Sequence, residues 1–342
     1  MTKKLSDNRI YWLDYAKVIG VFLMIYGHGS LCGDLCNYVY SFHMPMFFFI
    51  SGIFYKPLPL YDTIKRNWRG LLIPYFLLNF LCFLPQLLAL LWHGTLTIDK
   101  VFYSWGAVLL GLGYNSKGFI PISTPCWFIY ALFIAKVLMA MFLQKNRKNI
   151  VLLIVISLLT TIVLQYMEID LLIPLDSVLL AIPFICIGYL CKAKILMLVQ
   201  RKDLLIDIIT LLFLLLWLIL VPINGRVDMN TCNVGASLSL FYIIATIATF
   251  VFFRICYRLY DFSKKVKFVM GGVNIVSKST LLYVAFNLTA ISYTKSIIAH
   301  MFHLSIENVG IGFLIAVVVF FEHIPICMFV IKNCPVLIGK RK

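Results

Sequence analysis

The sequence predicts an all-α protein, a polytopic integral membrane bundle of about ten transmembrane helices with both termini in the cytoplasm. Three observations favour it: the composition, ten long apolar stretches and the placement of the positive charges. The chain is 62% hydrophobic and 13% charged, whereas a soluble domain is about 45–50% apolar and about 25% charged. Its mean hydropathy is +0.96. So few charges cannot cover that much apolar surface in water, which excludes a soluble enzyme, a secreted disulfide scaffold and a disordered chain.

Ten stretches approach the length of about 20 apolar residues that a helix needs to cross the hydrocarbon core. They are 11–32, 40–55, 71–93, 124–143, 150–168, 175–191, 204–222, 236–255, 279–299 and 309–331. The second is short, but it is almost entirely aromatic or aliphatic. Residues 102–114 are apolar but too short and too rich in glycine to span, so we expect a re-entrant or interfacial segment there. Because every polar connection is short, we expect a single domain over residues 1–342.

The positive charges orient these spans. The net charge is +16, and 24 of the 30 lysines and arginines fall in segments on the side of the N-terminus. This asymmetry is what the positive-inside rule predicts for an even number of spans with both ends in the cytoplasm. The excess charge then faces the anionic headgroups of membrane lipids, and no groove-reading motif indicates a nucleic-acid partner. Lys17 and Lys136 lie within spans.

The ten cysteines are mostly spread one to a helix, which is typical of buried apolar packing. Cys32 and Cys36 fall together on the outer side, where a disulfide between them is compatible with their spacing. No Cys/His cluster has the spacing of a zinc site, so no metal is predicted.

The first span carries Asp14, Lys17 and His28. An ionisable residue inside the bilayer is costly and usually marks function. Lys17 and His28 are 11 residues apart, which places them on nearly one helical face and about 16 Å apart along the axis. Asp14 is close enough to pair with Lys17, so that pair is either a salt bridge near the cytoplasmic end or part of a site. His28 is either a structural hydrogen-bonding residue or a group for proton transfer near neutral pH.

Two further sets of residues carry candidate chemistry. His43 lies just inside the outer end of the second span, before Pro45. Ser51-Gly52 in the same span lets another helix approach closely. Arg66 and Arg69 precede the third span and share a helical face. Arginine suits bidentate phosphate binding, although ordinary positive-inside charge explains the pair equally well.

These pieces together resemble the acyltransferase 3 family of membrane O-acyltransferases, and most closely its fucose 4-O-acetylase-like branch. The family motifs are a basic residue followed after ten residues by histidine, a second-helix signature, Arg-x-x-Arg, a Trp-Phe stretch and a polar segment typical of that branch. The matching residues are Lys17 and His28, Phe42-His43-Met44-Pro45, Phe49-Ile50-Ser51-Gly52, Arg66 and Arg69, Cys126-Trp127-Phe128-Ile129, and Asn224-Gly225-Arg226-Val227-Asp228-Met229. One departure is Asn287, which takes the place of a histidine that the family often has.

The resemblance implies transfer of an acyl group, usually acetyl, from cytosolic acyl-CoA (acetyl-CoA) to a sugar hydroxyl of a cell-surface glycan or its lipid-linked precursor. We expect His28 to act as the general base and Lys17, paired with Asp14, to neutralise a phosphate or polarise the thioester. We expect Arg66 and Arg69 to bind the phosphates of CoA. These are the candidate catalytic and donor-binding residues.

The acceptor is expected from the outer side, where amides and aromatic faces suit a sugar. The candidate acceptor-binding residues are His43, Trp127, Asn224, Arg226 and Glu322. Asn224 and Arg226 also fit an ordinary loop turn, and Glu322 also fits a pair with a polar group of another helix.

A competing class is a transporter or flippase for a glycan or small solute, since ten helices with polar residues along a channel suit that function too. Transporters often contain inverted repeats, and the sequence contains none that we detect. We expect a multi-pass protein of the cell membrane, of the bacterial inner-membrane type. Composition does not separate a lipid-facing surface from a subunit interface, so it predicts no oligomeric state.

Overall fold

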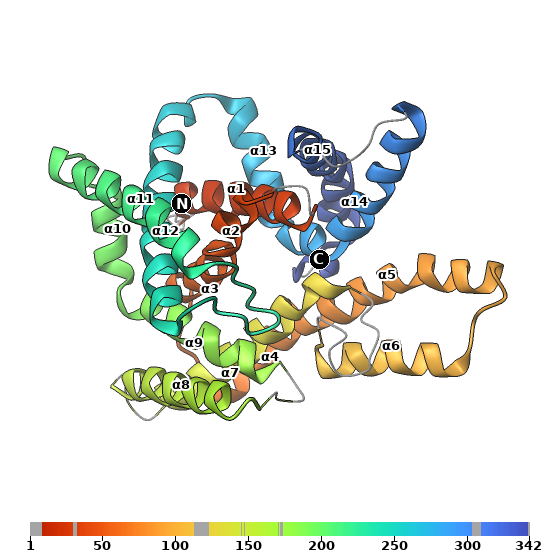
Figure 1. Ribbon diagram of the computed structural model, residues 1–342, viewed down its shortest axis with the longest axis horizontal. Helices are drawn as coiled ribbons and strands as arrows, with labels where there is room; N and C mark the ends of the chain where they lie inside the picture. The colour runs from red at the N-terminus through yellow and green to blue at the C-terminus, as the bar shows by residue number, and fades with distance from the viewer. Residues whose placement is uncertain are drawn as a thin grey trace, which may run out of the picture.

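A computed structural model describes residues 9–29, 33–112, 123–144, 146, 148–169, 171, 174–302 and 309–340. Within these ranges the chain is helical and has no strand, apart from one antiparallel bridge between Asp228 and Asn233. Figure 1 shows α1 at the centre of the view, surrounded by the other helices. The helices are α1 (Tyr11–His28), α2 (Leu35–Tyr40), α3 (His43–Ile53), α4 (Leu60–Asn67), η1 (Trp68–Leu72), α5 (Ile73–Trp92), α6 (Ile98–Leu110), η2 (Thr124–Cys126), α7 (Trp127–Leu143), α8 (Asn149–Tyr166), α9 (Leu175–Leu190), α10 (Lys192–Gln200), α11 (Leu204–Asn224), α12 (Leu238–Ser263), α13 (Lys267–Lys278), α14 (Thr280–Phe302), α15 (Val309–Asn333) and η3 (Pro335–Ile338).

Each of the ten predicted apolar stretches coincides with a helix. In the described part of the chain, six helical segments are long and apolar enough to cross a membrane: Leu60–Trp92, Asn149–Tyr166, Leu204–Asn224, Leu238–Ser263, Thr280–Met301 and Val309–Asn333. A seventh candidate consists of α9 and α10, which meet at a bend of 72°. The protein is therefore a helical membrane protein with six or seven clear candidate spans.

The other three stretches form α1, α3 and α7. The polar side chains of Asp14, Lys17 and His28 lower the hydropathy of α1. At 1.5 Å per residue, the 11 residues of α3 extend about 17 Å and the 17 residues of α7 about 26 Å. Both are shorter than the hydrocarbon core of about 30 Å. Two of the three are thus short, and all three lie within the bundle.

The apolar segment predicted as re-entrant or interfacial forms α6. This helix runs back alongside α5, and the pair projects from the bundle as an arm (Figure 1). The Trp105 ring packs edge-on against Phe83 at 5.8 Å, and Tyr75 Oη donates a hydrogen bond to the Val108 carbonyl oxygen at 2.7 Å. The end of the predicted segment, residues 113 and 114, lies outside the described residues.

Helices α3 and α9 are in backbone contact, and two glycines make that contact. A Cβ on Gly52 would collide with the carbonyl oxygen of Ile185, and a Cβ on Gly188 with that of Phe49. The close approach that Ser51-Gly52 predicts is therefore confirmed, with α9 as the partner. It holds α3 rigidly, and His43 lies at the first position of that helix.

Helix α1 packs against α12, α13, α14 and α15. Near its start Trp12 packs edge-on against Phe253 at 5.3 Å, and further along Phe22 packs against Phe313 at 5.6 Å. Beyond its C-terminus, the Lys295 ammonium donates to the carbonyl oxygen of Gly29 at 2.5 Å. A cation at this end satisfies a carbonyl that the helix leaves free and complements the helix dipole. These contacts fix the position of His28, the last residue of α1.

Candidate functional site

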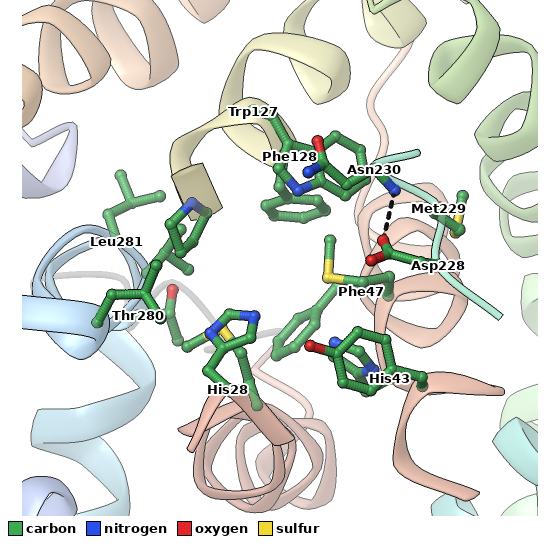
Figure 2. A pocket seen from close by; sticks show the side chains of 16 residues that line it. His28, His43, Phe47, Trp127, Phe128, Asp228, Met229, Asn230, Thr280 and Leu281 are labelled. Carbon is green, nitrogen blue, oxygen red and sulfur yellow. Dashed lines mark hydrogen bonds between the residues drawn. The ribbon is translucent and has the colours of Figure 1, made fainter. Parts of the chain in front are cut away.

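A cavity of about 170 Å³ lies at the C-terminal end of α1. Its lining comes from α1, α2, α3, η2, α7, α14 and the loop between α11 and α12. Figure 2 shows His28 and His43 on one side of the cavity, with Trp127 and Phe128 facing them and Asp228 and Asn230 at the flank. The lining residues are Met24, His28, Tyr40, His43, Met44, Phe47, Pro125, Trp127, Phe128, Asp228, Met229, Asn230, Thr280, Leu281, Val284 and Leu288. Three predicted site residues, His28, His43 and Trp127, therefore lie together.

The imidazole of His28 is held by the amide of Asn287. His28 Nδ1 lies 2.6 Å from Asn287 Oδ1. The Asn287 amide nitrogen donates to the carbonyl oxygens of Tyr283 and Val284, both at 2.8 Å, and Asn287 is fully buried. Both amide hydrogens are thus in use, and Oδ1 acts as acceptor.

This arrangement fixes the tautomer of His28. Because Asn287 Oδ1 accepts, His28 Nδ1 carries the hydrogen. In the neutral imidazole the other nitrogen, Nε2, then holds a free lone pair. His28 lines the cavity, so its side chain can accept a proton from a group bound there.

His43 also donates from Nδ1. Its Nδ1 lies 2.8 Å from the carbonyl oxygen of Val39, so this nitrogen donates and Nε2 is left as an acceptor. The Tyr40 ring packs edge-on between the two histidines, 5.1 Å from His43 and 6.4 Å from His28. The cavity therefore contains two imidazoles that each donate from Nδ1, beside a phenol.

The flank of the cavity is the loop between α11 and α12. Asp228 Oδ1 accepts from the backbone nitrogen of Asn230 at 2.9 Å, drawn as a dashed line in Figure 2. The bridge between Asp228 and Asn233 closes this turn. The carboxylate and the Asn230 side chain are the kind of polar groups that recognise hydroxyls. Neither residue was among the sequence candidates, although both belong to the polar segment that drew attention.

A second concave region lies between the segment from Leu58 to Ile73 and the C-terminal segment from Val336 to Lys340. This basic cleft has a volume of about 830 Å³ and is lined by Arg66, Arg69, Lys65, Lys340 and Asp62 together with apolar and glycine residues. Arg69 lies on the one-turn π-helix η1, and such π-turns are frequent at functional sites. The two arginines predicted to act together thus share one cleft.

The C-terminal segment forms one wall of the basic cleft. Gly339 has a φ of +71° and its Cα hydrogen faces the backbone of Gly70, where a Cβ would collide with the carbonyl oxygen. This contact seats Lys340 in the cleft. Burial, together with the neighbouring charges of Lys278 and Arg9, lowers the pKa of Lys340.

The comparison with known protein families decides the class. The acyltransferase domain profile of the acyltransferase 3 family matches residues 10–328. The chain belongs to the acyltransferase 3 family. No curated protein and no solved structure matches it.

Membership makes this protein a membrane acyltransferase, which needs an acyl donor and an acceptor. As an acyltransferase 3 protein it carries the family's first-helix pair as Lys17 and His28. The Lys17 ammonium lies 3.2 Å from Asp14, so the predicted salt bridge is present. Asp14 also accepts from Arg9 at 2.6 Å, and the Lys17 ammonium lies over the Phe54 ring at 4.8 Å. Neither Asp14 nor Lys17 lines the cavity.

Three candidate acceptor residues of this acyltransferase lie outside the cavity lining. Asn224 is buried and braces the loop: its amide donates to the Val234 carbonyl oxygen at 2.9 Å and its Oδ1 accepts from the Ser237 backbone nitrogen at 3.2 Å. This is the structural turn that the sequence left open.

Arg226 and Glu322 are also peripheral. The Arg226 guanidinium is exposed and stacks over the ring of Tyr40, a lining residue, at 4.8 Å. Glu322 is exposed on α15, and the Lys295 ammonium of the neighbouring helix α14 bonds to the Gly29 carbonyl oxygen. A direct contact between Glu322 and an acceptor in the cavity does not follow from this geometry.

Cys36 is disulfide-bonded, in keeping with the pairing suggested with Cys32, which itself lies outside the described residues. The described residues hold no group of three His, Cys, Asp or Glu side chains placed to bind a metal ion.

Proposed function

We propose that this membrane acyltransferase is an O-acetyltransferase that moves an acetyl group from cytosolic acetyl-CoA to a sugar hydroxyl. The observation that carries the proposal is the tautomer of His28, which leaves a proton acceptor in a cavity lined by aromatic and hydroxyl-recognising groups. Family membership favours an acyltransferase over a transporter or flippase.

The proposed topology has ten transmembrane helices with both termini in the cytoplasm, and the whole chain acts as one domain. Support comes from the placement of charge. Arg66, Arg69 and Lys340 share one cleft, and the charge pattern assigns all three to cytoplasmic segments. The same pattern assigns Arg226 to a segment on the opposite side of the membrane. The basic cleft then opens to the cytoplasm, where acyl-CoA is made, and the cavity lies toward the outer side of a cell membrane of the bacterial inner-membrane type.

In this arrangement the donor binds across the bundle. Arg66 and Arg69 hold CoA phosphates in the basic cleft, because guanidinium groups match phosphate oxygens. Helix α3 runs from His43 in the cavity to Ile53, shortly before Leu58 of the basic cleft, and its 11 residues extend about 17 Å. A slender pantetheine arm is suited to that path, with Lys17 beside it and Asp14 holding Lys17 in place.

The proposed acceptor is a sugar of a cell-surface glycan or its lipid-linked precursor, as in the fucose 4-O-acetylase-like branch. Trp127 offers an aromatic face, and His43, Asp228 and Asn230 offer hydrogen-bonding groups. Arg226 and Asn224 then act indirectly, by ordering the Tyr40 side chain and the loop.

The proposed reaction uses His28 as general base. As the acceptor hydroxyl oxygen attacks the thioester carbonyl carbon, Nε2 takes the hydroxyl proton and the carbonyl electron pair moves to oxygen. Return of that pair breaks the C–S bond, and the departing CoA sulfur takes the proton back from His28. The products are an ester and free CoA thiol, with His28 neutral again.

The test is transfer of labelled acetyl from acetyl-CoA by purified protein to a panel of sugars and glycolipids. The proposal expects labelled ester on at least one sugar acceptor, formed in proportion to the free CoA thiol released. Hydrolysis alone, or movement of a sugar across vesicles without acetyl transfer, would contradict it.

A further inference from the structure

A small pocket lies beside the basic cleft and is separate from the cavity. Its volume is about 30 Å³, and it lies where the end of α3, α4 and α7 meet. Arg66 and Leu58 line both this pocket and the basic cleft, so the two are neighbours. A space of this size admits one compact polar group.

The charges around this pocket are all of one sign. Lys136 lies in the apolar helix α7, about two turns before its end at Leu143, and is partly buried. Arg66 and Lys56 also line the pocket, and among the described residues of its lining none is acidic. Like charges gathered in a weakly hydrated place repel one another, so the fold gains from an anion there.

The buried hydroxyl of Tyr55 is a second, independent indication of a ligand in this pocket. Tyr55 lines the pocket and is 8% exposed. Its Oη is buried and makes no hydrogen bond of normal geometry with any described residue, although the Thr63 side chain in the same pocket is close enough for a weak interaction. Buried polar atoms are almost always paired. The pocket therefore presents the ammonium of Lys136, the guanidinium of Arg66 and the phenol of Tyr55 as donors, beside the neutral side chains of Thr63 and Asn67 and with no carboxylate in its lining.

We propose that Tyr55, Arg66 and Lys136 form a deep phosphate site that binds the diphosphate of the acyl-CoA donor. The assignment rests on the proposed function above. A phosphate of the diphosphate is compact, anionic and built of acceptor oxygens, and it lies in CoA between the nucleotide and the pantetheine arm. Arg69 and Lys340 then remain in the basic cleft for the 3′-phosphate of the nucleotide.

The test compares binding of CoA and of dephospho-CoA, which lacks the 3′-phosphate, to purified protein by titration calorimetry. Lys136→Met keeps the length of the side chain and removes the charge, so both ligands are expected to bind about tenfold or more weakly, by the same factor. Lys136→Arg is expected to retain most of the affinity. Lys194→Met is the matched control, because Lys194 is an exposed cation of α10, and it is expected to change nothing.

Tyr55→Phe separates binding from folding. Removing a buried hydroxyl without a partner does not destabilise the free protein, whereas it is expected to weaken CoA binding several-fold. Wild-type affinity in both Lys136→Met and Tyr55→Phe would overturn the deep phosphate site while leaving the proposed function intact. If these variants lose only bound phosphatidylglycerol, measured by mass spectrometry from lipid nanodiscs, the phosphate belongs to a lipid and the donor assignment is wrong. If wild-type protein binds no CoA, the proposed function fails, and this assignment with it.

Discussion

The side chain of Asn287 orients the imidazole of His28. Its amide nitrogen is committed to two carbonyl oxygens of its own helix, so its oxygen faces Nδ1 of His28. A histidine at this position, as the family often has, offers a different set of donors and acceptors. In this protein a neutral amide orients the His28 imidazole, and no charge is added to the buried site.

Replacing Asn287 by leucine removes that orientation. We expect Asn287→Leu to lower kcat for acetyl transfer about tenfold or more, because the imidazole loses its fixed tautomer. The KM for acetyl-CoA is expected to stay unchanged, because Asn287 does not take part in binding the acyl donor. Asn79→Leu is the control. Asn79 is buried to a similar extent, and its amide nitrogen likewise donates to the carbonyl oxygen four residues earlier, that of Tyr75. Equal losses of kcat in the two variants would show that Asn287 is only structural.

At the scale of single residues, the sequence indicates which side chains belong to the site better than it indicates which of them contact one another. His28, His43 and Trp127 were predicted from polar and aromatic side chains in spans, and the cavity contains all three. Asn287 lies 259 positions from His28, and no local pattern reveals that pairing. Lys136 is visible in the sequence as a charge within a span, but its proximity to Arg66 depends on how α7 packs against α4.

At the scale of helices, the contact between α3 and α9 is the most constrained. Each backbone fills the space that a side chain of the other would need. The small residues Ser51 and Gly52 predict that another helix approaches closely, but the identity of that helix depends on the tertiary fold. The π-turn η1 likewise has no signal in hydrophobic periodicity.

A methyl group at this contact forces the two helices apart. We expect Gly52→Ala to destabilise the protein by about 1–3 kcal/mol, seen as a lower midpoint of thermal unfolding in detergent. Gly271→Ala is the control, because Gly271 lies in α13 at a position where an added Cβ would meet no other atom within 4 Å. That control is expected to hold or raise the midpoint, because alanine favours a helix over glycine. A midpoint for Gly52→Ala equal to that of the control would refute the role given to this contact.

At the scale of the whole molecule, composition and charge placement predict a helical membrane bundle, and the fold bears this out. They do not predict how the polar groups are divided between two sites. The cavity at the end of α1 holds His28, whereas the basic cleft holds Arg66 and Arg69. This division depends on packing, because the cavity joins residues that are as far apart in the sequence as Met24 and Leu288.

The central claim is that His28 accepts the proton of the acceptor hydroxyl in this cavity. The most direct measurement is the turnover of His28→Ala with and without added imidazole, next to His300→Ala, a histidine exposed on α14. We predict that His28→Ala binds acetyl-CoA normally, loses about 10²–10⁴-fold in kcat and recovers part of it with imidazole, whereas His300→Ala matches the wild type. Wild-type turnover in His28→Ala would contradict the account.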